Sequence, residues 1–417
     1  MVEVRFAANI VHLVIVEGKN FVDAVDDIFP EERKTFQSSN ISVLLAVQAL
    51  KHFYLYENIL NEEKINLNSK QKCLVYIVLT NNFYTKVLSK NNCNSFLEGD
   101  LPEDEFRKLK KVLNQKESLE DLICFEKDSD FYYATKYNAP IWLVHMWRKH
   151  YGDELVKSFL EASINFNLQS YAVNTLKTTT QMLLLKYPDF SSPFEDMLIY
   201  SGTRRYQLTQ EFKDGDYIDV KIGFKNLIDT NFDPLQEVLI YSGYEDDFVK
   251  AAIIKSNKKQ SLNIAAPDLS YRADVLRFIR ENDVHNVNFF EAKDEYGLKA
   301  GVSYKQDLVI VFPKSTRFDV VSKYPDFLFH FDRDTLDEII EDERKALELC
   351  YDYVSDNGTL LYIVNTLNKK ECSGMVKEFL EKHPEFELDR EEQLITSHPF
   401  ATTMYYAYMH RKAVSND

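Results

Sequence analysis

The sequence predicts an all-helical N-terminal part followed by a doubly wound α/β domain. In residues 1–138 apolar side chains recur at helical spacing, and only two glycines and two prolines interrupt them. From residue 237 onward, short apolar runs alternate with helical stretches. Near the C-terminus, the run LLYIV at 360–364 precedes a helical stretch that stops at His383-Pro384. A buried strand that leads into a helix is typical of α/β domains.

Composition narrows the class of protein. A chain of 417 residues is long enough for two or three domains, and 45% hydrophobic residues suffice for sizeable cores. No apolar run reaches the roughly 18 residues of a membrane span, and the N-terminus lacks a small-residue cleavage site. The five cysteines are scattered without a CxxC pair. We therefore expect a reduced, cytoplasmic protein without a membrane segment, a signal peptide or a metal site.

The charge balance argues against a strongly basic binding surface. The formal net charge is −16, and three successive segments, 1–138, 139–237 and 238–417, carry −4, −3 and −9. Proteins that bind RNA usually carry a basic footprint. Tight, nonspecific RNA binding is therefore not expected, although a local basic patch remains open.

Residues 1–138 are predicted to form a helical bundle. Apolar stripes at helical spacing occur at 8–14, 41–59 and 71–88, and Pro102 opens a further helix.

Residues 139–237 are predicted to form a small linking part of mixed α+β type. Pro140 opens a helix with Trp142 and Trp147 on its core face, and Tyr151-Gly152 closes it before a second helix begins. The stretch SYAVNTLKTT, 170–179, is predicted to contain the first strand.

Residues 238–417 are predicted to alternate strands and helices and to end in an antiparallel hairpin. The strands are expected at 238–243, 261–267, 286–292, 307–313, 359–364 and 401–412, and the helices at 246–254, 273–279, 333–353 and 375–383.

Several stretches also resemble the sequence motifs of one protein family. Residues 5–18 match an R…A…V…V…EG pattern, 140–154 match P.WL…W…YG.E, and 173–177 match VN..K. Residues 313–326 keep the flanks of a P…PD loop, and 360–388 resemble LVYSTCS…EEN…V..FL..HP.F.L. These are the motifs of the RsmB/NOP-type (Sun family) methyltransferases, which act on cytosine carbon 5 of 16S ribosomal RNA.

The resemblance implies a three-part architecture. Residues 1–138 would be a NusB-like helical domain, 139–237 a linking subdomain of an RNA-binding type, and 238–417 a Rossmann-like S-adenosylmethionine-dependent methyltransferase domain.

The family needs a glycine-rich turn after the first strand for the cofactor and an acid after the second strand for its ribose. The family turn, LD.CAAPGGKT, is matched here at 262–270, where Ala265, Ala266 and Pro267 remain. Both glycines are absent, and Asp268 would place a carboxylate near that of the cofactor. The resemblance implies Glu291 as the ribose acid. We therefore expect this cofactor site to be degenerate.

The family also needs a cysteine thiolate, which adds to carbon 6 of cytosine before methyl transfer. Lys314 and Asn365 occupy the two family cysteine positions, and Cys372 is interpreted as a buried or half-exposed helix residue. The interval of 46 residues from Pro267 to Pro313 is short for the family and predicts a missing strand–helix step. These losses together predict an inactive methyltransferase scaffold.

The resemblance also suggests positions for RNA contacts, which basic and amide side chains would make. These residues are Asn174, Lys177, Arg204, Arg205, Lys314 and Arg317.

Three functions stay open. The first, which we favour, is a non-catalytic homologue that binds ribosomal RNA or the ribosome without a cofactor. The second is an active S-adenosylmethionine-dependent methyltransferase with altered motifs, which would require a thiol near Pro313. The third is a protein-interaction module that binds no RNA and acts through the helical domain. No DNA or membrane partner is expected.

Overall fold

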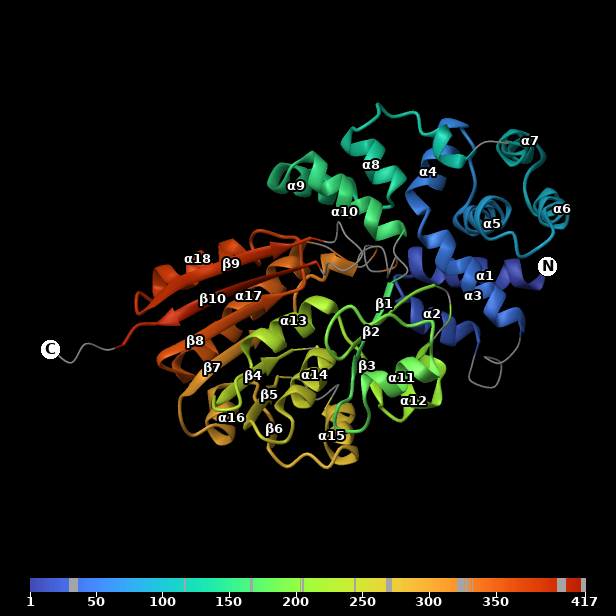
Figure 1. Ribbon diagram of the computed structural model, residues 1–417. Coiled ribbons are helices and arrows are strands. Elements are labelled where there is room, and N and C mark those ends of the chain that lie inside the picture. The colour runs from blue at the N-terminus through green and yellow to red at the C-terminus, as the bar shows by residue number, and fades with distance from the viewer. Residues whose placement is uncertain are drawn as a thin grey trace. The chain divides into compact units, whose positions relative to one another are not determined.

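The protein is represented by a computed structural model, and its described residues are 1–29, 37–115, 118–165, 168–202, 204, 206–243, 245–267, 272–320, 326, 329, 331, 333–395 and 403–413. The chain forms two units, a helical unit of residues 1–164 with 320–332 and an α/β unit of residues 165–319 with 333–417 (Figure 1). The predicted domain boundaries at 138 and 237 stay predictions.

The helical unit confirms the helices that the sequence predicted in its first 160 residues. Its helices are α1 (Val2–Ile15), α2 (Phe21–Ile28), α3 (Gln37–Leu50), α4 (Phe53–Glu62), α5 (Ser69–Thr80), α6 (Lys90–Asp100), α7 (Glu103–Leu113), α8 (Asp130–Lys136), α9 (Ile141–Tyr151) and α10 (Asp153–Asn165), with a π-turn at Asn81–Thr85 and a 3₁₀ turn at Leu119–Leu122. The stripe predicted at 41–59 is two helices, because the chain turns at Lys51-His52.

The core of the helical unit surrounds α1, which packs against α3 and α5. Its apolar face, including Val4, Ile10 and Val14, is fully buried. Farther along, Pro140 and Gly152 bound α9 as predicted, and Gly152 adopts a φ of +84° that favours glycine. The prediction for Trp142 is wrong, because its side chain is 44% exposed whereas Trp147 is buried.

The α/β unit contains two sheets and their covering helices. Its strands are β1 (Leu168–Val173), β2 (Met197–Ser201), β3 (Tyr217–Asp219), β4 (Val238–Ser242), β5 (Leu262–Ala266), β6 (Val287–Glu291), β7 (Gln306–Phe312), β8 (Val354–Val364), β9 (Phe386–Leu394) and β10 (Met404–Arg411). Its helices are α11 (Thr180–Lys186), α12 (Gln210–Lys213), α13 (Ile222–Asn231), α14 (Asp246–Ser256), α15 (Arg272–Glu281), α16 (Glu295–Gly301), α17 (Arg333–Cys350) and α18 (Ser373–Lys382), with 3₁₀ turns at Tyr206–Leu208, Phe318–Val320 and Tyr351–Tyr353.

The large sheet has the order β6-β5-β4-β7-β8-β10-β9, in which the first five strands are parallel and β10 is antiparallel to both neighbours. A late antiparallel hairpin is therefore present, as predicted; its second strand, β10, was predicted from the sequence, whereas its first strand, β9, was not. Strand β4 is the first in chain order, β5 lies on one side of it, and β7 lies on the other.

Helices cover both faces of the large sheet (Figure 1). Along β4, Val238 and Ile240 face a core built with α13, α14 and α15, whereas Leu239 and Tyr241 face a core built with α16, α17 and α18. This alternation is expected for a strand whose two faces are buried. The small antiparallel sheet, in the order β2-β1-β3, contributes to the first of these cores. None of the described helices has the length and apolar character that a membrane crossing requires.

Candidate functional site

A cavity lies at the carboxyl ends of the parallel strands. Because the chain continues from β4 to β5 on one side and reaches β7 on the other, the β4–β7 boundary is the point where the strand order reverses. Open α/β sheets bind ligands at such points. The cavity has a volume of about 780 Å³. Its walls come from the ends of β4, β5 and β7, from the start of α16 and from α17: Tyr241, Gly243, Pro267, Lys293, Asp294, Pro313, Lys314, Asp342, Lys345, Ala346, Glu348 and Leu349.

The turn after the first strand is not where the sequence comparison placed it. Because β4 precedes β5, this turn follows Ser242 and contains Gly243, whereas the Ala-Ala-Pro stretch follows the second strand. One glycine is therefore retained. A Cβ on Gly243 would lie 2.8 Å from the backbone nitrogen of Lys314. Glycine is thus required for the close approach of the ends of β4 and β7.

The residues predicted to bind the cofactor differ in their burial and in whether they line the cavity. Ala265 and Ala266 are buried in β5, and Pro267 contributes to the cavity wall. Glu291 ends β6, and its carboxylate lies 3.0 Å from the ammonium of Lys293. Asp268 lies outside the described residues. The prediction of a missing strand–helix step is wrong, because β6 and α16 fill the interval and the first step is β4 with α14.

The cavity has the size of a nucleoside-containing cofactor, and the helix that follows the first strand begins with carboxylates. A volume of about 780 Å³ is within the usual range for small-molecule sites. However, α14, the helix that follows the first strand, has Glu245 at its N-cap and Asp246 and Asp247 in its first turn. Burial and the neighbouring carboxylates raise the pKa of Asp247 to about 7. Glu245 pairs with Arg317 and Asp246 with Lys250, so Asp247 is the main source of repulsion for a further carboxylate, such as that of S-adenosylmethionine, at this helix terminus.

The two residues that the resemblance aligns with the family cysteines differ in exposure. Lys314 is exposed and lines the cavity, whereas Asn365, which follows β8, is fully buried. The Asn365 amide donates a hydrogen bond of 2.8 Å to Glu245, and its backbone oxygen accepts one from Ser315. Cys372 is buried as expected, and burial raises the pKa of its thiol. No cysteine is among the cavity residues.

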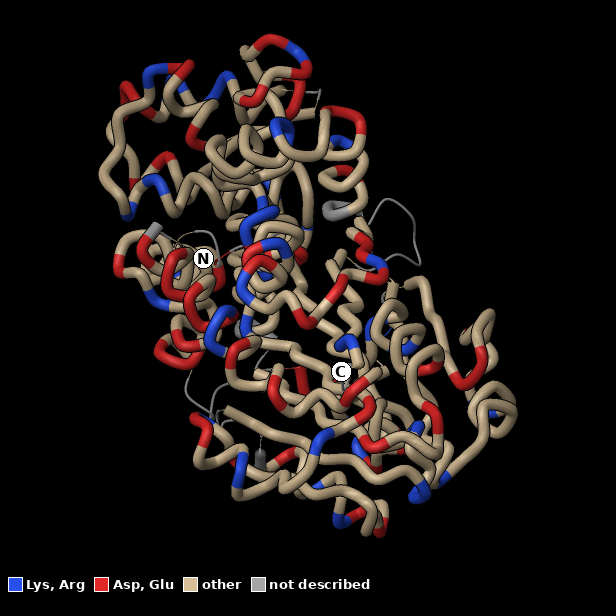
Figure 2. Tube along the Cα trace, turned by 90° about the vertical axis from the view of Figure 1, so that its left-hand side faces the viewer, with Lys and Arg blue, Asp and Glu red and all other residues tan. Residues whose placement is uncertain are grey.

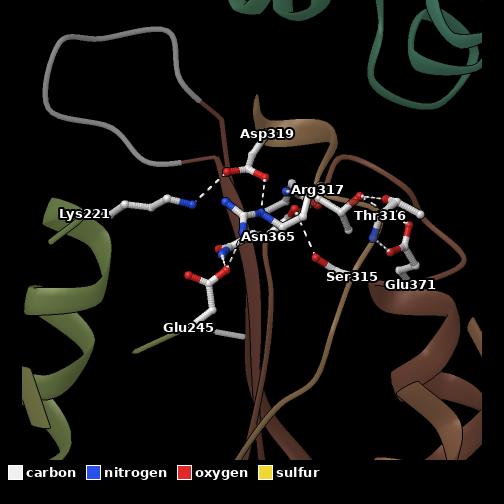
Figure 3. Close-up of polar contacts among 10 residues, drawn as sticks. Lys221, Glu245, Ser315, Thr316, Arg317, Asp319, Asn365 and Glu371 are labelled. Carbon is white, nitrogen blue, oxygen red and sulfur yellow. Dashed lines mark hydrogen bonds and ion pairs between the residues drawn. The ribbon is translucent and has the colours of Figure 1, made fainter. Parts of the chain in front are cut away.

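A network of charges fills the space beside Asn365 (Figure 3). The guanidinium of Arg317 lies 2.9 Å from Glu245 and 3.1 Å from Asp319, and Asp319 also lies 2.8 Å from Lys221. The Glu245 and Asp319 side chains are 10% and 4% exposed. Ion pairs this strongly desolvated need mutual compensation. The charge of Arg317 is therefore neutralised within the protein.

A second buried cluster lies next to this network. The carboxylate of Glu371 accepts hydrogen bonds from the backbone and hydroxyl of Thr316, each 2.7 Å, and from Asn368, also 2.7 Å. Glu343 on α17 is also fully buried, and burial together with the charge of Glu371 raises its pKa. Burial raises the pKa of Glu371 too, whereas its hydrogen-bond donors favour the ionised form, so of the two carboxyl groups Glu343 is the better place for a proton.

The predicted RNA contacts differ in exposure and in their partners within the protein. Asn174 is fully buried, and its amide donates hydrogen bonds to Gly215 and Asn282, so it is a structural residue. Lys177 is exposed and donates to the backbone of Asp214.

Arg204 is 52% exposed, pairs with Asp189 at 3.3 Å and lies over the ring of Tyr206. Arg205 lies outside the described residues. Acidic and basic residues are interleaved along the described part of the trace (Figure 2).

Sequence reasoning missed Glu245, Asp319 and Lys221. Each lies between predicted elements and matches no motif of the family. The pair Ser242-Gly243 at the end of the run VLIYSG could have identified Glu245, because it places Glu245 at the start of the helix that follows the first strand.

Comparisons with known proteins agree with this geometry. No protein-family model matches the chain. The probable ribosomal RNA small subunit methyltransferase B of Bacillus subtilis (strain 168) is 22% identical over 267 residues. The match covers 61% of this chain and 59% of that protein, which is less than two thirds of its length.

The chain is therefore similar in sequence to an RsmB-type methyltransferase. Three solved structures share its fold. The crystal structure of PH0851 matches with a TM-score of 0.72 at 16% identity, covering 98% of this chain and 99% of that one. NSun6 from Pyrococcus horikoshii with SFG matches with a TM-score of 0.56 at 11% identity, covering 64% and 97%. A methyltransferase homologue from Pyrococcus horikoshii matches with a TM-score of 0.56 at 13% identity, covering 67% and 97%.

Proposed function

We propose that this RsmB-type homologue binds ribosomal RNA or the ribosome without transferring a methyl group. The observation that carries the loss of catalysis is the environment of Asn365. It stands where the family has a cysteine, it is fully buried, and its amide is bonded to Glu245. Neither an amide nor the ammonium of Lys314 forms the covalent bond to cytosine that the reaction needs.

The charge at the start of α14 supports the same proposal. A methyl donor with a free carboxylate would approach a helix terminus that already holds Glu245, Asp246 and Asp247, of which Glu245 pairs with Arg317 and Asp246 with Lys250. Calorimetry with S-adenosylmethionine tests this step on the full chain. We expect no heat of binding at micromolar concentrations of the cofactor, and micromolar affinity would refute the proposal for this site.

The cavity at the strand ends favours a second candidate, in which the cofactor is still bound and methyl transfer continues with altered residues. S-adenosylmethionine would supply the methyl group, and Gly243 and Pro267 would contact it. A radiolabel assay on ribosomal RNA separates the candidates. Labelled 5-methylcytosine in that RNA would establish the second candidate, and its absence is the result we expect.

The RNA role rests on the relationship with the Bacillus subtilis protein and on the exposed cations Lys177, Arg204 and Lys314. Crosslinking and RNA capture from cells that express the full chain test it. We expect enrichment of ribosomal RNA over background. If no structured RNA is enriched, the third function, protein interaction through a NusB-like helical domain, replaces this one. The cytoplasmic location belongs to the same proposal.

A further inference from the structure

The strand β9 is an open edge of the large sheet. Within the described residues it pairs only with β10, and it ends the strand order on that side (Figure 1). It is nine residues long, whereas unpaired edges in stable proteins are usually short or covered. The register with β10 shifts at Asp389, and on either side of this shift the backbone groups of alternate residues point away from β10 and, among the described residues, have no neighbouring strand.

An apolar groove lies beside this edge. A hollow of about 610 Å³ separates β9 from α18, the helix that lies alongside it in Figure 1. The apolar side chains that line it are Val376 and Leu380 from the helix and Leu388 from the strand. Leu388 is 39% exposed, although the strand around it is polar. This arrangement provides pockets for alternate side chains of an added strand.

The charges along the edge select the partner. Strand β9 contains four carboxylates, on Glu387, Asp389, Glu391 and Glu392, and one guanidinium, on Arg390. All five residues are exposed, and Arg390 lies 4.2 Å from the centre of the Tyr408 ring.

The helix side of the groove carries both positive and negative side chains. Lys369, Lys377 and Glu381 line it, and the ammonium of Lys377 lies 3.9 Å from Glu381. Acidic residues alone would only protect an edge from aggregation. Together with the apolar groove they fit an extended segment with basic residues.

We propose that β9 and the groove beside α18 bind an extended basic segment of another protein by strand addition. Backbone hydrogen bonds to β9 would supply affinity, as in other cases of strand addition. Apolar side chains would enter the groove at Leu380 and Leu388, and Lys or Arg side chains at other positions would meet the carboxylates of β9. This surface is independent of the cavity at the strand ends.

The test uses a fluorescein-labelled peptide of nine residues that alternates Lys and Val, with the full chain at physiological salt. A second peptide has the same sequence but is N-methylated at every residue, which keeps the charge and removes the backbone donors. We expect fluorescence anisotropy to show binding of the first peptide and at least about tenfold weaker binding of the second. Hydrogen exchange should slow at the amides of β9 when the first peptide is bound.

Two variants localise the interaction. Leu388→Lys should weaken binding by about tenfold, because it removes an apolar anchor and adds a positive charge. Asp283→Lys is the matched control, since Asp283 is 80% exposed and precedes β6 at the opposite edge of the sheet. It should leave the affinity unchanged. Equal affinity for both peptides, no binding, or a dimer that protects β9 in sedimentation and exchange experiments would each overturn the proposal.

Discussion

At the scale of single residues, Asn365 has a structural role at a position that the family resemblance assigns to a cysteine. A cysteine that attacks a nucleobase must be accessible and readily deprotonated. Asn365 is instead buried, and its amide connects β8 to Glu245 at the start of α14. The side chain therefore stabilises the packing of two elements at the place where the family carries out chemistry.

The first prediction follows from this packing. The double variant Lys314→Cys with Asn365→Cys should show no methyl transfer in a radiolabel assay, because a thiol at position 365 would be buried and the acidic start of α14 would remain. The loss of the hydrogen bond to Glu245 should lower the free energy of unfolding by about 1–2 kcal/mol in urea. Lys314→Cys alone, at an exposed position, should leave stability unchanged. Methylated cytosine from the double variant would contradict the argument.

A second residue-scale prediction concerns Glu343. Its pKa is raised in the folded protein, so folding favours its protonated form. Stability then falls as pH rises above the ordinary pKa of glutamate, because the unfolded chain releases this proton first. Glu343→Gln removes the effect, since an amide carries no charge at any pH. It should raise the free energy of unfolding by about 1–3 kcal/mol at pH 8.

The pH dependence of this gain supplies the control. Urea unfolding at a series of pH values should show the gain shrinking as pH falls toward 4, where glutamate is protonated in both states. Glu338→Gln, at an exposed position on the same helix, should have little effect at any pH. A gain that is independent of pH would show that Glu343 does not hold a proton in the folded state.

At the scale of elements, hydrophobic periodicity predicted most helices and strands but not their roles. Runs such as VLIYS and LNIAA are short, apolar and alike, and a strand's place in a sheet depends on partners far away in the chain. The match to the family's sequence motif therefore placed the turn after the first strand at the end of β5. The pairing of β4 with both β5 and β7 shows instead that β4 is the first strand, so this turn contains Gly243.

Strand β9 was missed for a different reason. Six of its nine residues are charged or amide-bearing, so the sequence FELDREEQL lacks the apolar alternation of a strand. Pairing with the apolar strand β10 forms it nevertheless.

The network around Arg317 could not be predicted from the sequence either, because Lys221, Glu245 and Asp319 come from three separate connections and match no local pattern.

The third prediction tests the contact between strand ends. Gly243→Ala should lower the free energy of unfolding by about 1–3 kcal/mol, because the added methyl group would lie 2.8 Å from the backbone nitrogen of Lys314 and would push β4 and β7 apart. Gly99→Ala in α6 is the matched control, since nothing lies within 4 Å of its Cβ position. It should raise stability by about 0.5–1 kcal/mol. Equal effects in urea unfolding would exclude the proposed close approach.

At the scale of the whole molecule, net charge limits how RNA can be bound. The chain carries −16, and both Arg317 and Lys221 are already paired with internal carboxylates. Long-range attraction of a polyanion is therefore weak, and affinity must come from a small number of local contacts. Lys177, Arg204 and Lys314 are the exposed cations that the family resemblance places at such contacts.

The fourth prediction is therefore a shallow salt dependence. With about three phosphate contacts on a single strand, the logarithm of the binding constant should fall with the logarithm of salt concentration with a slope of about −2. Arg204→Glu should weaken binding of a labelled stem–loop RNA and make the slope shallower by roughly one contact. Arg277→Glu, which removes an equally exposed arginine that also pairs with an aspartate, should change neither. A steep slope in the unmodified protein would mean that many more cations reach the RNA than this acidic chain presents, and the contacts assigned to Lys177, Arg204 and Lys314 would have to be abandoned.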